Sequence, residues 1–142
     1  MRQLIRQGKI SLDVKEAACH LIADLPQKDR LGELSRLFYF VRDQIRYVWD
    51  INDIEELKGA PYLLKIKAGD CDDKCILGCA LAESIGYTTR LVAIGPNQRD
   101  FVHVYYEVCL DGNWIPCETT ENVQFGELPD LSAYSYCKIL EN

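Results

Sequence analysis

The segment with the most reactive side chains is GDCDDKCILGCALAESIGY, residues 69–87. It places Cys71 among three aspartates and adds Cys75 and Cys79 at four-residue steps. Four interpretations fit such a segment: a metal site, a disulfide framework, a reactive thiol, or a buried helix that is rich in cysteine. They imply different chemistry, and the spacing of the side chains separates them.

A metal site is disfavoured by the spacing of the three cysteines. On a helix, four residues rise about 6 Å and eight about 12 Å, whereas the sulfur ligands of a tetrahedral zinc ion lie within about 4 Å of each other. No two cysteines of the chain are separated by just two residues. The zinc-deaminase signature also fails, because His103 has no glutamate two residues later and Pro116-Cys117 has no second cysteine. We therefore expect no metal and no cofactor.

Most of the seven cysteines suit packing in a core. Cysteine acts as a small hydrophobic side chain and is among the residue types most often buried. We expect this role for six of them: Cys19, Cys75, Cys79, Cys109, Cys117 and Cys137. The aspartates also have a structural explanation, because Asp70 can cap a helix and Asp72 and Asp73 complement its positive end.

Cys71 differs because it would be the first residue of that helix, directly after a Gly-Asp turn. The free backbone N–H groups and the helix dipole at this position favour a thiolate. The same N–H groups can hold the oxyanion that forms when a thiolate attacks a carbonyl. Three neighbouring carboxylates oppose the thiolate, so a nearby imidazolium is needed to stabilise it.

Only His20 and His103 can supply the imidazolium. His20 lies in a predicted helix, where a structural role is expected, whereas His103 lies in the alternating segment FVHVYYEVCL. With a two-residue Asp111-Gly112 turn, Glu118 becomes a diagonal neighbour of His103, about 7–8 Å away at the backbone. A turn looser by two residues would place them opposite each other, and an odd shift would put them on different faces. The sequence therefore predicts a Cys-His-acid triad, provided that the sheet packs against the start of the Cys71 helix.

The elements that must position these residues follow from periodicity and turn residues. Helices are expected over 11–23, 29–48 and 71–86, with one short helix in the loop 50–69. Strands are expected over 90–95, 101–110, 113–120 and 132–140. Helices that precede an antiparallel sheet predict an α+β fold.

Composition narrows the function classes. The chain has 142 residues and 48% hydrophobic residues, which suits one domain, 1–142, with its own core. A net charge of −6 argues against a nucleic-acid or anionic-membrane partner. The first residues have no apolar run of signal-peptide length and no membrane-spanning run occurs, so we expect a soluble cytoplasmic protein with reduced thiols.

Taken together, VRDQIRYVWD, KAGDCDDKC, ALAESIGYTTRLVAIG, HVYYEV and DGNWIPCETT resemble the transglutaminase-like superfamily. The small versions in bacterial and prophage genomes are the most similar. The resemblance implies a papain-like α+β core over about 29–129, after an N-terminal helical segment of about 1–28 and before a tail, 130–142. In that core a helix headed by the nucleophile packs on an antiparallel sheet.

The resemblance also assigns roles. Cys71 would be the nucleophile, His103 the base and Glu118 the acid, in a W-x-P-x-D position where the family more often has aspartate. Glu121, three residues later, is an alternative acid. A second oxyanion donor is not fixed by any motif, and the candidates are Gln44, Tyr47 and Trp49.

These residues predict cysteine-dependent acyl chemistry on a protein or peptide amide substrate. With water as the acceptor the enzyme is a peptidase or amidase, and with an amine it is an acyltransferase. Hydrolysis is the expected outcome for a small bacterial member. The alternative is a non-enzymatic binding or assembly module of a prophage that keeps the fold.

Overall fold

The computed structural model describes residues 1–49 and 57–141. The helices in these residues are α1 (Arg2–Lys9), α2 (Leu12–Ile22), α3 (Arg30–Gln44), α4 (Ala60–Ile66) and α5 (Cys71–Ser84). The strands are β1 (Arg46–Tyr47), β2 (Ala68–Gly69), β3 (Thr88–Gly95), β4 (His103–Leu110), β5 (Asn113–Cys117) and β6 (Tyr136–Glu141). The helices precede the main sheet in the chain, so the predicted α+β class is confirmed.

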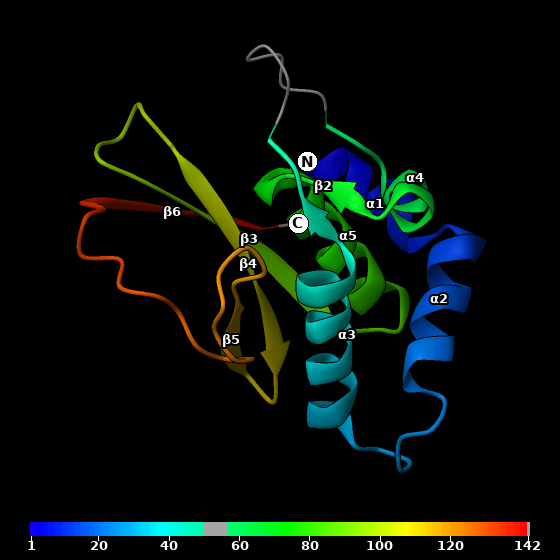
Figure 1. The fold of residues 1–142 in the computed structure, drawn as a ribbon. Helices are drawn as coiled ribbons and strands as arrows, with labels where there is room; N and C mark the ends of the chain where they lie inside the picture. Colours follow the sequence, from blue (N-terminus) through cyan, green and yellow to red (C-terminus); the bar gives the residue numbers. More distant parts are fainter. Residues whose placement is uncertain (50–56, 142) are drawn as a thin grey trace.

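The main sheet is antiparallel, with strand order β5-β4-β3-β6. Figure 1 shows the helices gathered on one side of it, with α5 against β3 and β4. Along β4, Val104, Tyr106 and Val108 belong to the large core that includes α5. Tyr105 alternates with them and joins a smaller cluster with Val92, packed by Leu131. The strand therefore has one face toward α5 and one face away from it.

Helix α5 is the centre of the core, and its residues 73–82 are all buried. It approaches the sheet most closely at Gly78, where an added Cβ would lie 2.5 Å from Cζ of the buried Tyr106 ring. Only glycine leaves room for that ring. The helix ends at Ser84, two residues earlier than expected, and the left-handed Gly86, with φ of 100°, follows and stops it.

The β4–β5 hairpin has the predicted register. Asp111 and Gly112 both have positive φ, 52° and 83°, as a two-residue type I′ turn requires. Leu110 then pairs with Asn113, and the pairing continues to Tyr106 and Cys117. This register determines where Glu118 emerges beside β4.

The second predicted helix is too long by four residues. It ends at Gln44 rather than at Val48, because β1 follows at once and pairs in parallel with β2. The backbone N–H of Arg46 donates to Lys67, and that of Val48 donates to Gly69. Pairing with a segment more than twenty residues away thus overrides the helical pattern of the side chains.

Other boundaries also differ from the sequence-based expectations. Helix α1 was not predicted, and the strands expected over 113–120 and 132–140 are shorter, ending at Cys117 and beginning at Tyr136. Helix α4 matches the short helix expected in the loop, and residues 50–56 of that loop lie outside the described residues. No helix in residues 1–49 or 57–141 has the length and apolar character needed to cross a membrane.

Candidate active site

Cys71 occupies the first position of α5, as predicted, and is partly buried. The side chain of Asp70 caps the helix by accepting a hydrogen bond from the Asp73 N–H at 3.0 Å. Asp73 is fully buried and forms an ion pair with Lys58 at 2.8 Å. Two of the three aspartates therefore have structural roles. The N–H of Cys71 has no carbonyl one turn earlier in the helix, so it can serve a ligand.

His103 and Glu118 lie in direct contact. His103 Nε2 is 2.6 Å from Glu118 Oε2, and the two side chains are 18% and 1% exposed. His103 begins β4, so its ring lies at the end of the sheet, where the Cys71 side chain is close enough to interact with it. Because Glu118 holds Nε2, Nδ1 is the ring nitrogen left for the sulfur. The imidazole thus connects a thiol from α5 with a carboxylate from the β4–β5 hairpin.

The surroundings of His103 favour its charged form. Burial lowers the pKa of the ring, but hydrogen bonds and charge interactions with Cys71 and Glu118 outweigh burial and raise the pKa from 6.5 to about 10. An imidazolium at neutral pH stabilises a thiolate beside it. It also carries the proton that a leaving amine needs.

Glu118 is held in its ionised form. Burial raises the pKa of this carboxyl, but the His103 hydrogen bond and charge, together with hydrogen bonds from Thr120, lower the pKa below its ordinary value. Thr120 donates from its backbone N–H at 2.8 Å and from its hydroxyl at 2.7 Å, both to Oε1. Those bonds also turn the chain out of β5, which explains the short strand. Glu121, the alternative acid, is exposed and lines a cavity instead.

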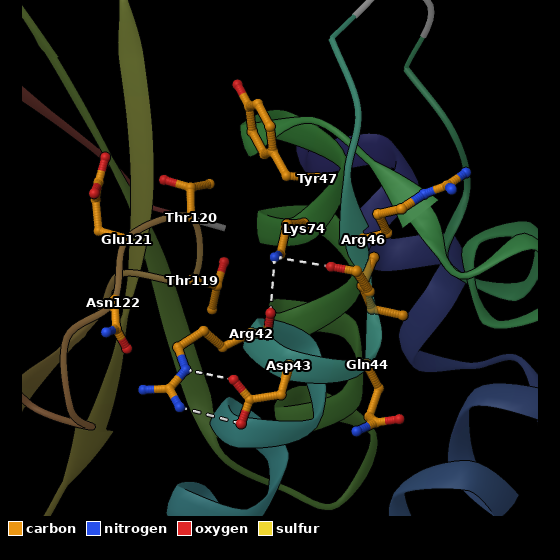
Figure 2. A pocket seen from close by; sticks show the side chains of 11 residues that line it. Arg42, Asp43, Gln44, Arg46, Tyr47, Lys74, Thr119, Thr120, Glu121 and Asn122 are labelled. Atoms are coloured by element: carbon orange, nitrogen blue, oxygen red, sulfur yellow. Dashed lines mark hydrogen bonds and ion pairs between the residues drawn. The ribbon is translucent and has the colours of Figure 1, made fainter.

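Of the three candidate oxyanion donors, Tyr47 has the best position. The β1–β2 pairing places Tyr47 beside Gly69, two residues before Cys71. Burial, followed by the charges of Cys71 and nearby carboxylates, raises the pKa of the Tyr47 hydroxyl to about 12, so it keeps its proton as a hydrogen-bond donor. Gln44 points away from Tyr47 in Figure 2, and Trp49 is 78% exposed.

Sequence reasoning missed Lys74, one turn after Cys71 on α5. Its side chain is only 2% exposed, and burial lowers the pKa of its ammonium group. Figure 2 shows its Nζ donating to the carbonyl oxygens of Arg42 and Ile45, at 3.2 and 3.0 Å. Lys74 therefore connects the helix that begins at Cys71 to the chain that leads into Tyr47. A lysine within an apolar helical segment was the signal that could have revealed it.

Two cavities meet at this site. One of about 390 Å³ lies between the end of α3 and residues 119–122, and Figure 2 shows Lys74 and Thr119 in its wall. The other, of about 570 Å³, includes His103 in its wall. Tyr47, Thr120 and Glu121 line both cavities. Together they form a larger space beside His103 than either cavity alone.

The remaining cysteines separate into two groups. Cys75, Cys79 and Cys117 are buried, as predicted. The prediction of core packing was wrong for Cys19 and Cys137, which are exposed, and Cys109 is only partly buried. Cys137 lies in β6, an edge strand of the main sheet with exposed residues on both faces, and Cys19 lies on an exposed part of α2. Within the described ranges, no group of three or more His, Cys, Asp or Glu side chains is arranged to hold a metal.

Comparison with solved structures supports this fold. A proposed cysteine protease from Cytophaga hutchinsonii has 18% identity and a TM-score of 0.63 over 97% of this chain and 51% of its own. A proposed protease from Parabacteroides distasonis has 12% identity and a TM-score of 0.66 over 83% of this chain and 25% of its own. The chain thus spans about half of the first structure and a quarter of the second.

Comparison with curated proteins gives no match. The model of the transglutaminase-like superfamily matches residues 20–119, which include the start of α5, the histidine strand and the acid after β5. The papain-like α+β arrangement expected from the resemblance is present as well. The chain belongs to the transglutaminase-like superfamily.

Proposed function

We propose that this protein is a cysteine-dependent enzyme that hydrolyses amide bonds of peptides through Cys71, His103 and Glu118. One observation carries the proposal: a partly buried imidazole contacts a buried carboxylate on one side and lies close to a helix-start thiol on the other. A titratable group in a cleft whose pKa is strongly shifted by specific charged partners is typical of a functional site. Membership of the superfamily, and the proposed protease activity of both structural relatives, agree with it.

The first half-reaction acylates the thiol. The Cys71 thiolate attacks the carbonyl carbon, a C–S bond forms, and the carbonyl π electrons move onto oxygen. The Cys71 N–H and the Tyr47 hydroxyl hold that oxyanion. When the intermediate collapses, the C–N bond breaks and the departing amine takes the proton from Nδ1 of His103, which leaves a thioester and a neutral imidazole.

The second half-reaction releases the acyl group. His103 takes a proton from water as the water oxygen attacks the thioester carbon, and the C–S bond breaks to return the thiolate and the imidazolium. Glu118 keeps the ring oriented and stabilises its cationic form throughout. An amine in place of water would give acyl transfer with the same residues.

Selective alkylation tests the thiol before any substrate is known. We expect iodoacetamide at pH 6 to modify Cys71 faster than the exposed Cys19 and Cys137, as resolved by peptide mass spectrometry. Exposure alone predicts the opposite order, so the two exposed cysteines act as controls within the same molecule. The preference should disappear in His103→Gln. Equal, slow labelling of all three would instead favour the non-enzymatic binding or assembly module.

Turnover tests the reaction itself. A mixture of internally quenched peptides should be cleaved by the wild-type protein and by Cys19→Ala, but not by Cys71→Ala at equal thermal stability. Cleavage by Cys71→Ala would show that another residue is the nucleophile. Adding a primary alkylamine such as methylamine separates the acceptors, because an N-methylamide product reports acyl transfer and a carboxylic acid reports hydrolysis.

A further inference from the structure

The 570 Å³ cavity beside His103 has a distinctive wall. Three of its lining residues are aromatic: Tyr47, Trp49 and Tyr134. Two more, Glu121 and Asp130, are acids. None of its lining residues, all within the described part of the chain, is lysine or arginine, and the positive charge of His103 is paired with Glu118. A cavity that opens on the reactive imidazole and combines aromatic faces with carboxylates favours a cationic group.

The aromatic part forms a corner. The rings of Tyr47 and Trp49 are perpendicular, at 90°, with centroids 5.5 Å apart. Trp49 is nevertheless 78% exposed. Two perpendicular rings can offer their π faces to a single cation, and tryptophan provides the strongest such face. The two rings are therefore already arranged to receive a cation, and most of the Trp49 indole surface is accessible to a ligand.

The acidic part of the same wall is charged. Asp130 accepts a hydrogen bond from the Ser132 N–H at 2.9 Å, and this bond lowers the pKa of its carboxyl. Glu121 lies on the chain after β5, and Val102 and Leu131 add apolar surface to the wall. This combination of apolar surface and carboxylates matches a lysine or arginine side chain, whose long stem is apolar and whose head is cationic.

We infer that this cavity is a substrate subsite for a basic side chain next to the scissile amide, so that the enzyme selects lysine- or arginine-containing peptides. The inference rests on the proposed function, because it assumes that His103 marks the reacting bond. The residues that would recognise the side chain are Trp49, Glu121 and Asp130. None of them takes part in the chemistry of the triad.

A charge-selective thiol reagent tests the subsite without any turnover. Cys71 would react with methanethiosulfonates that carry a trimethylammonioethyl, a sulfonatoethyl or a methyl group; each forms a mixed disulfide and releases methanesulfinate. We expect the cation to react faster than the anion, with a ratio that falls as salt is raised. In Glu121→Gln/Asp130→Asn the ratio should drop about fivefold, as expected for two exposed ion pairs. Trp49→Ala should lower the cation's rate about threefold and leave the methyl reagent unchanged.

A matched control removes the effect of net charge. Asp13→Asn/Glu16→Gln, on the exposed side of α2, makes the same change in charge far from His103 and should keep the wild-type ratio. A double variant at Glu121 and Asp130 that keeps the wild-type ratio would overturn the inference. So would a wild-type protein with no preference between the two charged reagents.

Peptides then test the substrate class. Three quenched peptides that differ at one position beside the scissile bond should give kcat/KM in the order lysine, norleucine, glutamate. The Glu121→Gln/Asp130→Asn variant should lower kcat/KM about fivefold for the lysine peptide only. Equal kcat/KM for the three peptides would refute the subsite. If no peptide is cleaved but the reagent ratio still depends on Glu121 and Asp130, the proposed hydrolysis fails while the cationic subsite stands.

Discussion

Replacing Glu118 with glutamine should lower the pKa of His103 from about 10 toward 6.5. Glutamine has nearly the same shape and can still accept a hydrogen bond from Nε2, but it carries no charge. The ring would then keep its burial, which lowers its pKa, and lose the charge interaction with Glu118 that opposes burial. Of the two charge interactions that raise the pKa of His103, only the one with Cys71 would remain.

The magnitude follows from the pKa itself. A rise from 6.5 to about 10 means that the folded protein favours the proton on His103 by roughly 5 kcal/mol. A hydrogen bond to a charged partner contributes about 1.5–3 kcal/mol of this. We therefore expect the midpoint in Glu118→Gln to fall by about 1–2 pH units.

The same shift sets how stability depends on pH. The folded pKa of His103 is raised, so the stability it contributes is fully present below pH 6.5 and is lost as the pH rises through about 10. The folded pKa of Glu118 is lowered, so its contribution is present above 4.5 and is lost as the pH falls through the folded value. In Glu118→Gln this loss should be smaller and complete at lower pH, because the folded pKa of His103 lies closer to 6.5.

An NMR titration of the histidine Cε1–H signals measures this directly. The chain has only two histidines, so His20 provides a second signal in every sample. Glu121→Gln, which removes the exposed acid three residues later, should leave the His103 midpoint at its wild-type value. A wild-type midpoint near 6.5, or an unchanged midpoint in Glu118→Gln, would refute the ion pair on which the triad depends.

Two further substitutions test the support of the site. Lys74→Met should lower the free energy of unfolding by about 1–3 kcal/mol, because the buried carbonyls of Arg42 and Ile45 lose their donor. Urea unfolding measures this change, and unchanged stability would show that water replaces the ammonium group. Gly78→Ala should lower the free energy of unfolding by about 1–3 kcal/mol because the new methyl group overpacks against Tyr106. This loss exceeds the gain of up to about 1 kcal/mol from helix propensity. A stabilised variant would mean that α5 and β4 can move apart freely.

The parts of the site that local pattern determines could be predicted from the sequence. The Asp111-Gly112 turn fixes the hairpin register by itself, and the register then places Glu118 near His103. Asp70 signals the start of α5, which puts Cys71 at the helix tip. Each of these predictions depends on residues close together in the chain, where side-chain type and backbone geometry are directly coupled.

The parts that long-range contacts determine could not be predicted. The helical pattern of α3 continues to Val48, but pairing with residues 67–69 converts its last turn into a strand and positions Tyr47. Helix α1 has little local signal, and it docks where Gly8 lies against Ala80 and Ala60. Such contacts join segments far apart in the sequence, so no periodicity in either segment reveals them.

The geometry of the site depends mainly on how the start of α5 is held. The β1–β2 pairing fixes the residues just before Cys71, and Lys74 fixes the turn just after it. The chain that carries Tyr47 therefore holds the start of α5 in place on both sides of Cys71. The histidine and its acid come from the sheet, and the close contact between Gly78 and Tyr106 sets the separation of helix and sheet. Because the Cys71 thiol and the His103 imidazole belong to different layers, they stay close only if this separation is maintained. A contact two turns along α5 from Cys71 is therefore a condition for the proposed chemistry.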